Sequence, residues 1–388
     1  MNEKTTNLKL AFALFVYFPR GGLTKSLVAI AQACRRRGHQ VRVFAGECRG
    51  AVDDGIDLRL LPPKARTNHG KQLDFVRSLK TAVAEFAPDL LVGFNRMPNL
   101  DIYYAADGCF ADKVHRRNWL YRITPRCRHF LAFEKTVFCR ASSTRILMIA
   151  KNQMRVYQNN YGTPRERIAL LPPGIVRDRI AGDDATIRRK HFREQWQVGD
   201  GDKLLLAVGS GFRTKGLDRT LKALASLPAD VLNRTRLFVV GDDNAAPFER
   251  IARRLGIHTR VRFVNGRDDV PAFLLGADLL VHPAYREAAG KVLLEAMVAG
   301  LPVITTDVCG YAHYVRDEDM GEVLPSPFEQ VALNRSLLQL METKRDRWRE
   351  RGRSFAQKAN IYDMPLHACR RIEEIFQQTK TGRDDPAS

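Results

Sequence analysis

Residues 277–305 read ADLLVHPAYREAAGKVLLEAMVAGLPVIT, a short apolar run, an amphipathic stretch and a second apolar run. The small residues 288–290 mark the start of a predicted helix, and Gly300 followed by Pro302 marks its end. Because two parallel strands are joined by a long crossover that is usually a helix, this stretch predicts one strand–helix–strand unit. It indicates an α/β fold with a parallel sheet.

The same alternation continues in both directions along the 388-residue chain. Near the amino end, we predict a helix over 24–37 that is closed by Gly38. The predicted strands are 8–17, 40–44, 89–93 and 146–149 in the first half and 203–209, 236–241, 260–265, 278–282 and 301–305 in the second. The pattern predicts two doubly wound parallel sheets with helices on both faces.

The stretch Leu170-Leu-Pro-Pro-Gly174 interrupts this alternation and suggests a domain boundary. We predict two Rossmann-like domains, over 1–172 and 173–360, and then a helix with a frayed tail over 361–388 that could pack back on the first domain. In doubly wound sheets, ligands bind outside the carboxyl ends of the strands. We therefore expect the two domains to face one another across a cleft that holds the active site.

The composition is that of a globular protein with an excess of positive charge. Hydrophobic residues make up 45% of the chain and charged residues 27%, which argues against intrinsic disorder. Lys and Arg number 63 against 43 Asp and Glu, which gives a formal net charge of +20. Such an excess favours a polyanionic partner, which could be a nucleic acid, an anionic membrane or a phosphorylated ligand.

The cysteines and the apolar runs bear on the compartment. The seven cysteines have no regular spacing, which argues against a disulfide framework and against a structural zinc site. The longest apolar run, Leu10–Phe18, is far shorter than the ~20 residues of a membrane span. Pro19-Arg-Gly-Gly22 follows it in place of a signal-peptide cleavage site, so we interpret the run as a buried strand. We therefore expect a cytoplasmic protein with reduced thiols.

Glu287 and Glu295 lie on either side of the predicted helix start, eight positions apart. That spacing corresponds to roughly 12 Å along a helix axis. Two carboxylates at such a distance are too far apart for a paired acid–base site, and they suit two hydroxyl-rich parts of one long ligand. The backbone N–H groups at the helix start offer a further site for polar or anionic groups. On spacing alone, the alternative is an amphipathic helix with two exposed glutamates.

Several motifs together resemble the retaining glycosyltransferases of family four, which have the GT-B fold. They are Glu287-x7-Glu295, Ala277-Asp-Leu-Leu-Val-His-Pro283 before it and Gly300-x-Pro-Val-Ile304 after it. More narrowly, the chain is similar to the lipopolysaccharide core transferases that add the first outer-core hexose to inner-core heptose. The stretches that carry this similarity are Gly209-Ser-Gly-Phe, Lys215-Gly216, His282-Pro-Ala-Tyr285, Cys309-Gly-Tyr-Ala-His-Tyr314, Tyr17-Phe-Pro-x-Gly-Gly-Leu23 and Gly93-Phe-Asn-x-Met-Pro-x-Leu-Asp101.

This resemblance implies a role for each carboxylate of the pair. Glu295 is expected to hold the ribose hydroxyls of a nucleotide sugar, and Glu287 the hexose, whose hydroxyls also meet the backbone amides of 288–290. The chemistry suits both roles, because an ionised carboxylate can accept two hydroxyl protons at once. Gly266-Arg267 occupies the place where the family holds the base.

The stretch Gly209-Ser-Gly-Phe-Arg-Thr-Lys-Gly216 follows an apolar strand and combines glycines with cations. Glycines let the backbone approach a phosphate, and Lys and Arg neutralise it, although the order is neither that of a Walker loop nor that of a dinucleotide-binding loop. The resemblance implies that Lys215 and a second cation, Arg213 or Arg179, stabilise the departing diphosphate in place of a metal ion. For Arg213, the alternative is a solvated loop cation.

Two features of the first half complete the predicted site. The pair Gly21-Gly22 lets backbone approach the phosphates, with a tight turn as the alternative, and Asp101 is the candidate for contact with the acceptor hydroxyl, with a solvent-exposed aspartate as the alternative. The residues expected to be catalytic are Asp101, Lys215 and Glu287. The residues expected to bind the donor are Gly21, Gly22, Arg179, Gly209, Arg213, Lys215, Gly266, Arg267, Glu287, Ala288, Ala289, Gly290 and Glu295.

The segment 113–128 contains six cations and no acid, and aromatic side chains are interleaved with the cations. This composition is typical of a segment that binds an anionic membrane surface, with single-stranded nucleic acid or a solvated basic loop as the alternatives. Because the core transferases have their membrane-binding region here, we predict a protein bound peripherally to the cytoplasmic face of the inner membrane. The residues expected to bind it are Lys113, Arg116, Arg117, Trp119, Tyr121, Arg122, Arg126 and Arg128.

We therefore predict a two-domain GT-B enzyme whose first domain binds the acceptor and whose second binds the nucleotide sugar. It is expected to transfer a hexose, with glucose first among the candidates, from a UDP-sugar to inner-core heptose of lipopolysaccharide, with retention. No cofactor and no metal ion are expected, since Lys215 and neighbouring cations take the place of the metal. UDP-galactose and a UDP-N-acetylhexosamine are alternative donors. A nucleic-acid-binding protein on a Rossmann-like scaffold is the alternative from a different class.

Overall fold

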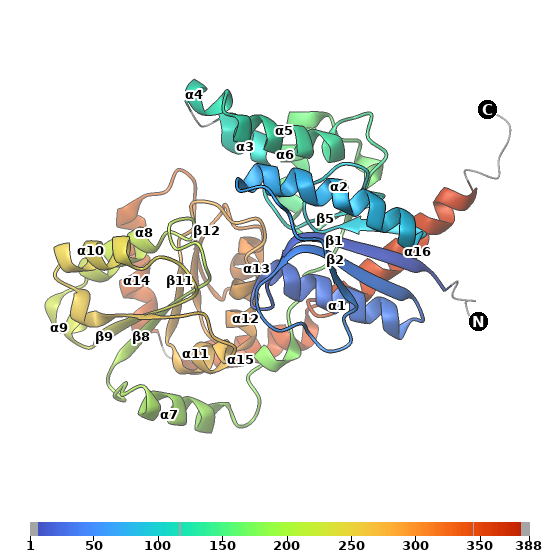
Figure 1. The fold of residues 1–388 in the computed structure, drawn as a ribbon. Coiled ribbons are helices and arrows are strands. Elements are labelled where there is room, and N and C mark those ends of the chain that lie inside the picture. The colour runs from blue at the N-terminus through green and yellow to red at the C-terminus, as the bar shows by residue number, and fades with distance from the viewer. Residues whose placement is uncertain (1–6, 116–117, 344, 382–388) are drawn as a thin grey trace. The chain divides into compact units, whose positions relative to one another are not determined.

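The computed structural model describes residues 7–115, 118–343 and 345–381, which fold as two compact α/β units. The first unit combines the chain up to Gly174 with the part from Ile361 onward, and the second unit spans Ile175–Asn360. In Figure 1, each unit is a sheet with helices packed on both of its faces.

The sheet of the first unit is parallel, in the strand order β3-β2-β1-β4-β5-β6-β7. Its strands are β1 (Lys9–Tyr17), β2 (Gln40–Cys48), β3 (Leu58–Leu60), β4 (Leu90–Gly93), β5 (Ile102–Ala105), β6 (Arg145–Met148) and β7 (Ile168–Leu170). Its helices are α1 (Gly22–Arg36), α2 (Asn68–Phe86), α3 (Phe110–His115), α4 (Trp119–Arg122), α5 (Pro125–Phe138), α6 (Lys151–Tyr161) and α16 (Met364–Thr381), with a short 3₁₀ turn, η1 (Arg165–Arg167).

Helix α16 lies at the other end of the chain but packs against α1. Glu373 of α16 accepts from Arg37 Nε at 2.7 Å and lies 2.8 Å from His39 Nε2. Although burial opposes it, these two partners hold the pKa of Glu373 below its usual range. His39 is itself fixed, because its Nδ1 accepts the N–H of Leu8 at 3.2 Å. The last helix is thus joined to the first unit by a hydrogen-bonded cluster.

The sheet of the second unit is also parallel, in the order β10-β9-β8-β11-β12-β13. Its strands are β8 (Lys203–Val208), β9 (Thr235–Val240), β10 (Val261–Val264), β11 (Leu279–His282), β12 (Val303–Thr306) and β13 (Gly321–Leu324). Its helices are α7 (Ala185–Gln195), α8 (Leu217–Ala225), α9 (Ala229–Asn233), α10 (Ala246–Arg254), α11 (Val270–Gly276), α12 (Lys291–Val298), α13 (Ala312–Asp317), α14 (Gln330–Glu342) and α15 (Arg345–Lys358), with 3₁₀ turns η2 (Arg177–Arg179) and η3 (His258–Arg260).

The predicted α/β fold with two doubly wound parallel sheets is confirmed. Most of the strands that the sequence predicts are buried on both faces and read as apolar runs, as in Leu204–Leu206 at 0% exposure, whereas the predicted edge strand β10 is only partly buried. Four strands were missed: β3, β5, β7 and β13. Three of them lie at sheet edges and are three or four residues long, and β5 reads only Ile-Tyr-Tyr-Ala, so none carries a long apolar run.

Both sheets reverse their winding at one strand, and this position is where a doubly wound fold forms its binding crevice. In the first sheet β1 lies between β2 and β4, and Gly21-Gly22 follows its carboxyl end. In the second sheet β8 lies between β9 and β11, and Gly209 follows its carboxyl end. The topology therefore places the glycine-containing loops of each sheet at its switch point.

Among the described helices, none is long and apolar enough to cross a membrane.

Candidate active site

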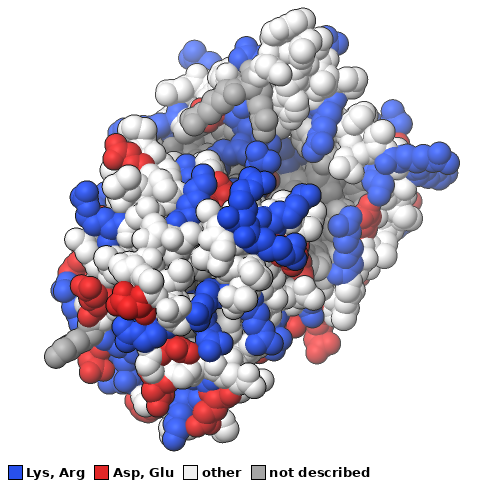
Figure 2. All heavy atoms as spheres, turned by 90° about the vertical axis from the view of Figure 1, so that its left-hand side faces the viewer, with Lys and Arg blue, Asp and Glu red and all other residues white. Residues whose placement is uncertain are grey.

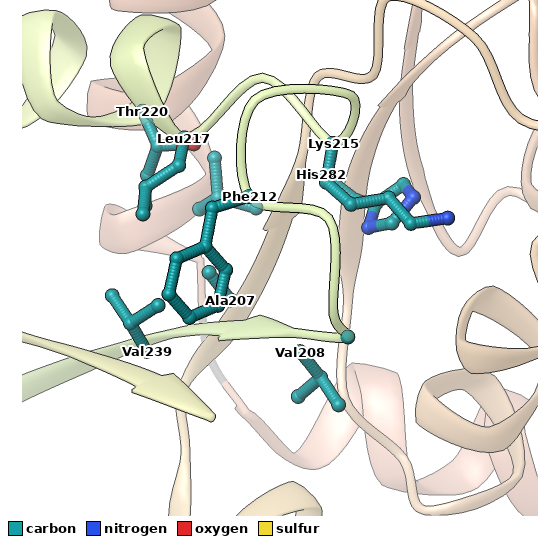
Figure 3. Close-up of a pocket in the computed structure, with 10 residues that line it drawn as sticks. Ala207, Val208, Phe212, Lys215, Leu217, Thr220, Val239 and His282 are labelled. Carbon is teal, nitrogen blue, oxygen red and sulfur yellow. The ribbon is translucent and has the colours of Figure 1, made fainter. Parts of the chain in front are cut away.

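The loop 209–216, called the Lys215 loop here, joins β8 to α8 at the switch point of the second sheet. Three of its glycines, at 209, 211 and 216, have positive φ angles of 119°, 84° and 76°, which other residues adopt only with strain. Phe212 N donates to Asp243 Oδ2 at 2.7 Å and ties the loop to the end of β9. A pocket opens beside the loop (Figure 3), and it is lined by Ala207, Val208, Gly209, Phe212, Lys215, Leu217, Thr220, Val239, Val281 and His282.

Lys215 is the mostly buried cation of this loop, and its ammonium forms an ion pair with Glu287. Burial of the ammonium lowers the pKa of Lys215. The pair is three-quarters buried or more, with 25% of the Lys215 side chain and 15% of the Glu287 side chain exposed. The structure therefore brings together the two residues that the sequence assigned to the diphosphate and the hexose.

His282 ends β11 directly behind this pair and is buried. Figure 3 shows its ring beside the side chain of Lys215, and its Nε2 lies 3.5 Å from Glu287 Oε2. Burial, with a smaller contribution from the charge of Lys215, lowers the pKa of His282 to about 3. The imidazole is therefore neutral at pH 7. A neutral ring adds no charge that would compete with Lys215 for the carboxylate.

The start of α12 supplies backbone N–H groups next to Glu287. Gly290 is the N-cap of the helix with φ +88°, so the chain can turn sharply between Glu287 and the first helical residue, Lys291. Glu287 pairs through its backbone with Cys309, and Ala289 O accepts from Tyr311 N at 2.8 Å. These contacts fix the 287–290 turn against the segment after β12.

Arg179 and Glu295 form a second charged pair within the same unit. Glu295 lies in the second turn of α12, and its Oε1 is 3.9 Å from Arg179 Nε. The Arg179 side chain is only 9% exposed and donates through Nη1 to Asp178 at 3.0 Å. Arg213, in contrast, is exposed on the Lys215 loop. Of the two arginines that the sequence offered as a second cation, Arg179 is the buried one and lies next to a predicted donor-binding carboxylate.

Gly266 and Arg267 follow β10, at the carboxyl edge of the second sheet. Gly266 N donates to Asp242 Oδ1 at 2.8 Å, and a Cβ at this glycine would lie 2.1 Å from Asp242 Oδ2. The guanidinium of Arg267 donates to both oxygens of Asp269, at 2.6 and 2.7 Å, and lies over the ring of Trp196. Contact of Arg267 with a nucleotide base stays a prediction, because these guanidinium N–H groups are already bonded to Asp269.

In the first unit, Gly21 is the N-cap of α1, directly after β1. Its N–H donates to Phe18 O at 2.8 Å, and Thr24 Oγ1 accepts from Phe18 N at 3.1 Å, so the turn is closely tied to β1. Gly22 has open space where a side chain would begin. The expected contact of this glycine pair with a donor phosphate stays a prediction.

Asp101 does not lie where an acceptor contact requires it. It precedes β5 and therefore lies at the amino-terminal edge of the parallel sheet, whereas ligands bind at the carboxyl edge. Its Oδ2 accepts the N–H of Leu91 at 2.7 Å and its carbonyl accepts the N–H of Arg145 at 2.9 Å, so it joins β4, β5 and β6. We therefore correct the assignment: the structure gives Asp101 a role in strand pairing and offers no support for contact with the acceptor.

The carboxylate that lies beyond the carboxyl end of β5 is Asp107, which the sequence analysis missed. Its side chain is 52% exposed, and its Oδ2 is 3.6 Å from Nη2 of the mostly buried Arg96. Arg96 also donates to Glu134, which is fully buried and accepts from the N–H of Phe110 at 2.7 Å and of Ala111 at 2.8 Å. This network fixes the loop that carries Asp107. A prediction of β5 would have revealed it, because Asp107 is the first acid after that strand.

The described part of the basic segment presents an apolar tip. On α4 and just after it, Trp119, Leu120 and Ile123 are 68%, 53% and 52% exposed. Arg122 is also exposed, and its Nη2 donates to His115 O at 2.9 Å. Arg126 and Arg128 are exposed on α5, Tyr121 and Lys113 are half-buried, and Arg116 and Arg117 lie outside the described residues.

Metal-ligating groups gather in one place among the described residues, at His39, Cys369 and Glu373. Their ligand atoms lie within 4.8 Å of one another in the first unit. Glu373 is held there by Arg37, whose guanidinium donates to both carboxylate oxygens, and His39 Nδ1 already accepts a backbone N–H. The cluster thus serves to attach α16, and it involves none of the predicted site residues.

Comparisons with known proteins agree with this geometry. The family model for Glycosyltransferase Family 4 matches residues 20–179, and that for Glycosyl transferases group 1 matches residues 188–355. The lipopolysaccharide glucosyltransferase WaaG of Escherichia coli K12 is 43% identical over 363 residues, which cover 93% of this chain and 97% of the relative.

Solved structures extend the likeness to the fold. A crystal structure of WaaG matches with a TM-score of 0.91 over 94% of this chain and 99% of that one. Anabaena HepE in complex with UDP and glucose matches with a TM-score of 0.72 at 18% identity, a likeness of fold alone. The identity to WaaG extends over nearly the whole length of both chains, so the chain belongs to the WaaG family of glycosyltransferases, which have the GT-B fold.

Proposed function

We propose that this glycosyltransferase moves glucose from UDP-glucose to an inner-core heptose of lipopolysaccharide, with retention of configuration at the anomeric carbon. The observation that carries the proposal is the Lys215–Glu287 ion pair at the switch point of the second sheet, in a chain 43% identical to a lipopolysaccharide glucosyltransferase. A nucleotide sugar needs a cation for its diphosphate and an acceptor of hydroxyl protons for its hexose. Lys215 and Glu287 supply both groups at one place.

In the proposed complex, the donor extends along the start of α12. Glu295 accepts the ribose hydroxyl protons, and Arg179, 3.9 Å from it, contributes positive charge beside the nucleotide. The backbone of the Lys215 loop approaches the diphosphate, because its glycines leave the amides uncovered. The N–H groups at the start of α12 and the carboxylate of Glu287 orient the hexose.

The bond from the anomeric carbon to the diphosphate breaks with development of positive charge on the sugar and negative charge on the leaving oxygen. Lys215 stabilises the leaving group, and its burial makes that interaction stronger than it would be in water. Because His282 is neutral, it does not weaken the hold of Glu287 on the sugar by attracting the carboxylate. The chain's own cations thus supply the charge that a metal ion supplies in other transferases, so we propose a metal-independent reaction.

The acceptor and the membrane are assigned to the first unit. A lipid acceptor that carries phosphates suits the net charge of +20. Figure 2 shows Lys and Arg side chains over much of the face at the left of Figure 1, with Asp and Glu side chains among them. The exposed Trp119, Leu120 and Ile123 lie next to the arginines of α4 and α5, a pairing of apolar and basic groups that suits the headgroup level of an anionic membrane. We propose that the enzyme binds peripherally to the cytoplasmic face of the inner membrane.

The test is release of UDP from three donors in the presence of lipopolysaccharide truncated at the inner-core heptoses. UDP-glucose should react fastest, and UDP-galactose and UDP-N-acetylglucosamine at least tenfold more slowly. Activity should also survive EDTA. Faster reaction with another donor would show that its sugar, and not glucose, is transferred. Activity that is lost to EDTA and restored by Mg²⁺ or Mn²⁺ would show that a metal ion, and not Lys215 alone, neutralises the diphosphate. Thermal stabilisation by RNA but not by UDP would favour the nucleic-acid-binding alternative.

A further inference from the structure

The residues 283–287, called the Glu287 segment here, connect β11 to α12 and pack against the Lys215 loop. The N–H of Tyr285 donates to Thr214 O at 2.9 Å. A Cβ at Gly216 would lie 2.0 Å from Pro283 O, so only glycine allows the approach. The loop that carries the lysine and the segment that carries the glutamate are therefore in direct backbone contact.

Arg219, in the first turn of α8, is hydrogen-bonded to the Glu287 segment. Its Nη1 donates to the carbonyl oxygens of Pro283 and Ala284, at 3.0 and 3.3 Å. Its guanidinium lies over two aromatic rings, with the central carbon 3.6 Å from the ring centroid of Tyr285 and 3.7 Å from that of Phe328. A planar group that is stacked on two rings and bonded to two carbonyls has little freedom to move.

The surroundings of this guanidinium are themselves fixed. Tyr285 Oη donates to Asp218 Oδ2 at 2.8 Å, which joins the stacked ring to the same helix, α8. Ala284 O also accepts from Thr306 Oγ1 at 2.8 Å, and this bond connects the segment to β12. Gln330 Nε2 donates to the backbone carbonyl of Arg219 at 3.1 Å. The segment is thus bonded to the Lys215 loop, to α8 and to β12, and Arg219 makes two of these hydrogen bonds in addition to its stack on Tyr285.

We propose that Arg219 is a positioning residue for the transfer reaction, which sets the place of the Glu287 carboxylate relative to the Lys215 ammonium. Lys215 and Arg219 are four positions apart across the start of α8, so they move together with that helix end. Arg219 reaches the Glu287 segment through Pro283 and Ala284, four and three residues before the catalytic carboxylate. The inference rests on the proposed function, because there the two groups act on one donor.

The chemical consequence follows from distance. The rate of a reaction falls roughly 10²-fold when the groups that act on the breaking bond are misplaced by about 1 Å. A lysine at position 219 keeps the charge, but its ammonium is a point charge on a flexible stem and cannot stack as a plane between rings while donating to two carbonyls. Arg219→Lys is therefore expected to loosen the segment without removing a charge.

The experiment measures kcat for UDP release by wild type and by Arg219→Lys, with UDP-glucose and heptose-terminated lipopolysaccharide. We expect kcat to fall roughly 10- to 100-fold, by the cost of misplaced catalytic groups. The thermal midpoint should stay within a few degrees of wild type, and the Kd for UDP within about threefold, since Glu295 and Arg179 are untouched. An unchanged kcat in a folded Arg219→Lys would overturn the proposal.

A double-mutant cycle separates positioning from simple stabilisation. In a Lys215→Ala background there is no ammonium to misplace, so Arg219→Lys should lower the residual rate by less than about threefold. A side chain that merely stabilises the fold would lower the rate by the same factor in both backgrounds, and that result would overturn the inference. If Arg219→Lys fails to fold, the same cycle is run with Phe328→Leu, which keeps the guanidinium and removes one ring. It should show the same coupling at smaller amplitude, and additivity there would refute the proposal.

The matched control is Arg347→Lys on α15. Arg347 also lies over an aromatic ring, 5.0 Å from the Trp348 centroid, and forms an ion pair with Asp319 at 2.6 Å. Within the described parts of the chain, Arg347 forms no hydrogen bond or ion pair with the Lys215 loop or the Glu287 segment, so the variant should have the kcat of wild type. A wild-type enzyme that is inactive with every UDP-sugar would refute the proposed function. An active wild type with an unaffected Arg219→Lys would refute the inference alone.

Discussion

The carboxyl edges of the two sheets differ in how well their residues match the sequence analysis. At the edge of the second sheet, Lys215 and Glu287 form an ion pair, and Arg179 lies 3.9 Å from Glu295. At the first sheet, the predicted acceptor contact, Asp101, lies at the opposite edge and accepts a hydrogen bond from a neighbouring strand. Both predictions came from residues that follow an apolar run, but only those of the second unit lie together at the carboxyl edge of their sheet.

The difference lies in the strands that precede the residues. In the second unit, β8 and β11 are apolar runs buried on both faces, so the loop after each is placed correctly once the strand is recognised. In the first unit, the short β5 was missed, and Asp101 was read as following β4 when it precedes β5. A candidate residue in an α/β fold is therefore only as well placed as the strand before it.

The largest expected effect tests the edge at which the residues converge. Replacing Lys215 with Ala removes the buried cation beside the leaving group, so we expect kcat to fall by roughly 10²–10³, as when one group that stabilises a developing charge is removed. The measurement is steady-state UDP release at saturating UDP-glucose. Arg213→Ala, on the same loop, tests the other candidate cation. Because Arg213 is exposed, we expect it to act as a solvated loop cation and the variant to lose less than about threefold.

The pH profile gives the same prediction a second measure. Burial lowers the pKa of Lys215, and only the protonated amine can stabilise the diphosphate, so kcat should be full below that pKa and should decline as the pH rises through it. Titration of His282 should not change kcat near neutral pH, because its pKa of about 3 keeps the ring neutral there. The residual rate of Lys215→Ala should lack the alkaline decline, and a decline that persists would assign it to another group.

The second effect concerns the basic segment of the first unit. The variant replaces four arginines with serine: Arg116, Arg117, Arg122 and Arg126. Since each basic residue near an anionic surface contributes about 1 kcal/mol, four of them contribute about 4 kcal/mol. We therefore expect the affinity for vesicles with anionic lipids to fall by roughly 10³-fold, measured by co-sedimentation. Part of the binding should resist salt, because the exposed Trp119 adds apolar contact.

Its control removes the same charge from the second unit. The residues replaced with serine in the control are Arg234, Arg250, Arg253 and Arg254, all exposed on or beside α9 and α10. The control should sediment with the vesicles much as wild type does. The variant should keep its activity on a short water-soluble acceptor, and co-sedimentation of the variant equal to that of wild type would refute the membrane assignment.

The third effect divides the second unit into its nucleotide and sugar halves. Glu295→Gln removes a charged acceptor for the ribose hydroxyls, a contact made equally in the ground state and the transition state. We expect KM for UDP-glucose to rise roughly tenfold, the cost of one hydrogen bond to a charged group, with kcat changed less than about threefold. A normal KM with a collapsed kcat would place Glu295 at the reacting centre.

The sequence predicted the α/β class and both sheets, and it named Lys215 and Glu287, which the structure brings together. The physical reason lies in which signals are local. Glu295 lies on α12 and Glu287 lies four residues before its first residue, on either side of a recognisable helix start, so the sequence itself places them near one another. Arg219 could not be found in this way, because its partners, at 283–285 and 328, are distant in sequence and reach it only through the packing of α8 against two loops. The same holds for Arg96 and Glu134, which are 38 positions apart.

The smallest expected effect tests the corrected residue of the first sheet. Asp101→Ala leaves the N–H of Leu91 without its side-chain acceptor, so the free energy of unfolding should fall by about 1–3 kcal/mol. Because Asp101 lies at the edge away from the ligand, kcat and both KM values should stay within about twofold of wild type at a temperature where the variant is folded. Asp107→Asn is the matched change at the carboxyl end of the same strand. It removes a half-exposed charge that lies 3.6 Å from Arg96, at the carboxyl end of β5 where a ligand of the first sheet would bind. If the acceptor binds there, the variant should raise KM for the heptose acceptor severalfold while leaving KM for UDP-glucose and the stability near wild type. The opposite result, in which Asp101→Ala abolishes transfer and Asp107→Asn has no effect, would show that Asp101 contacts the acceptor and that its position at the amino-terminal edge is wrong.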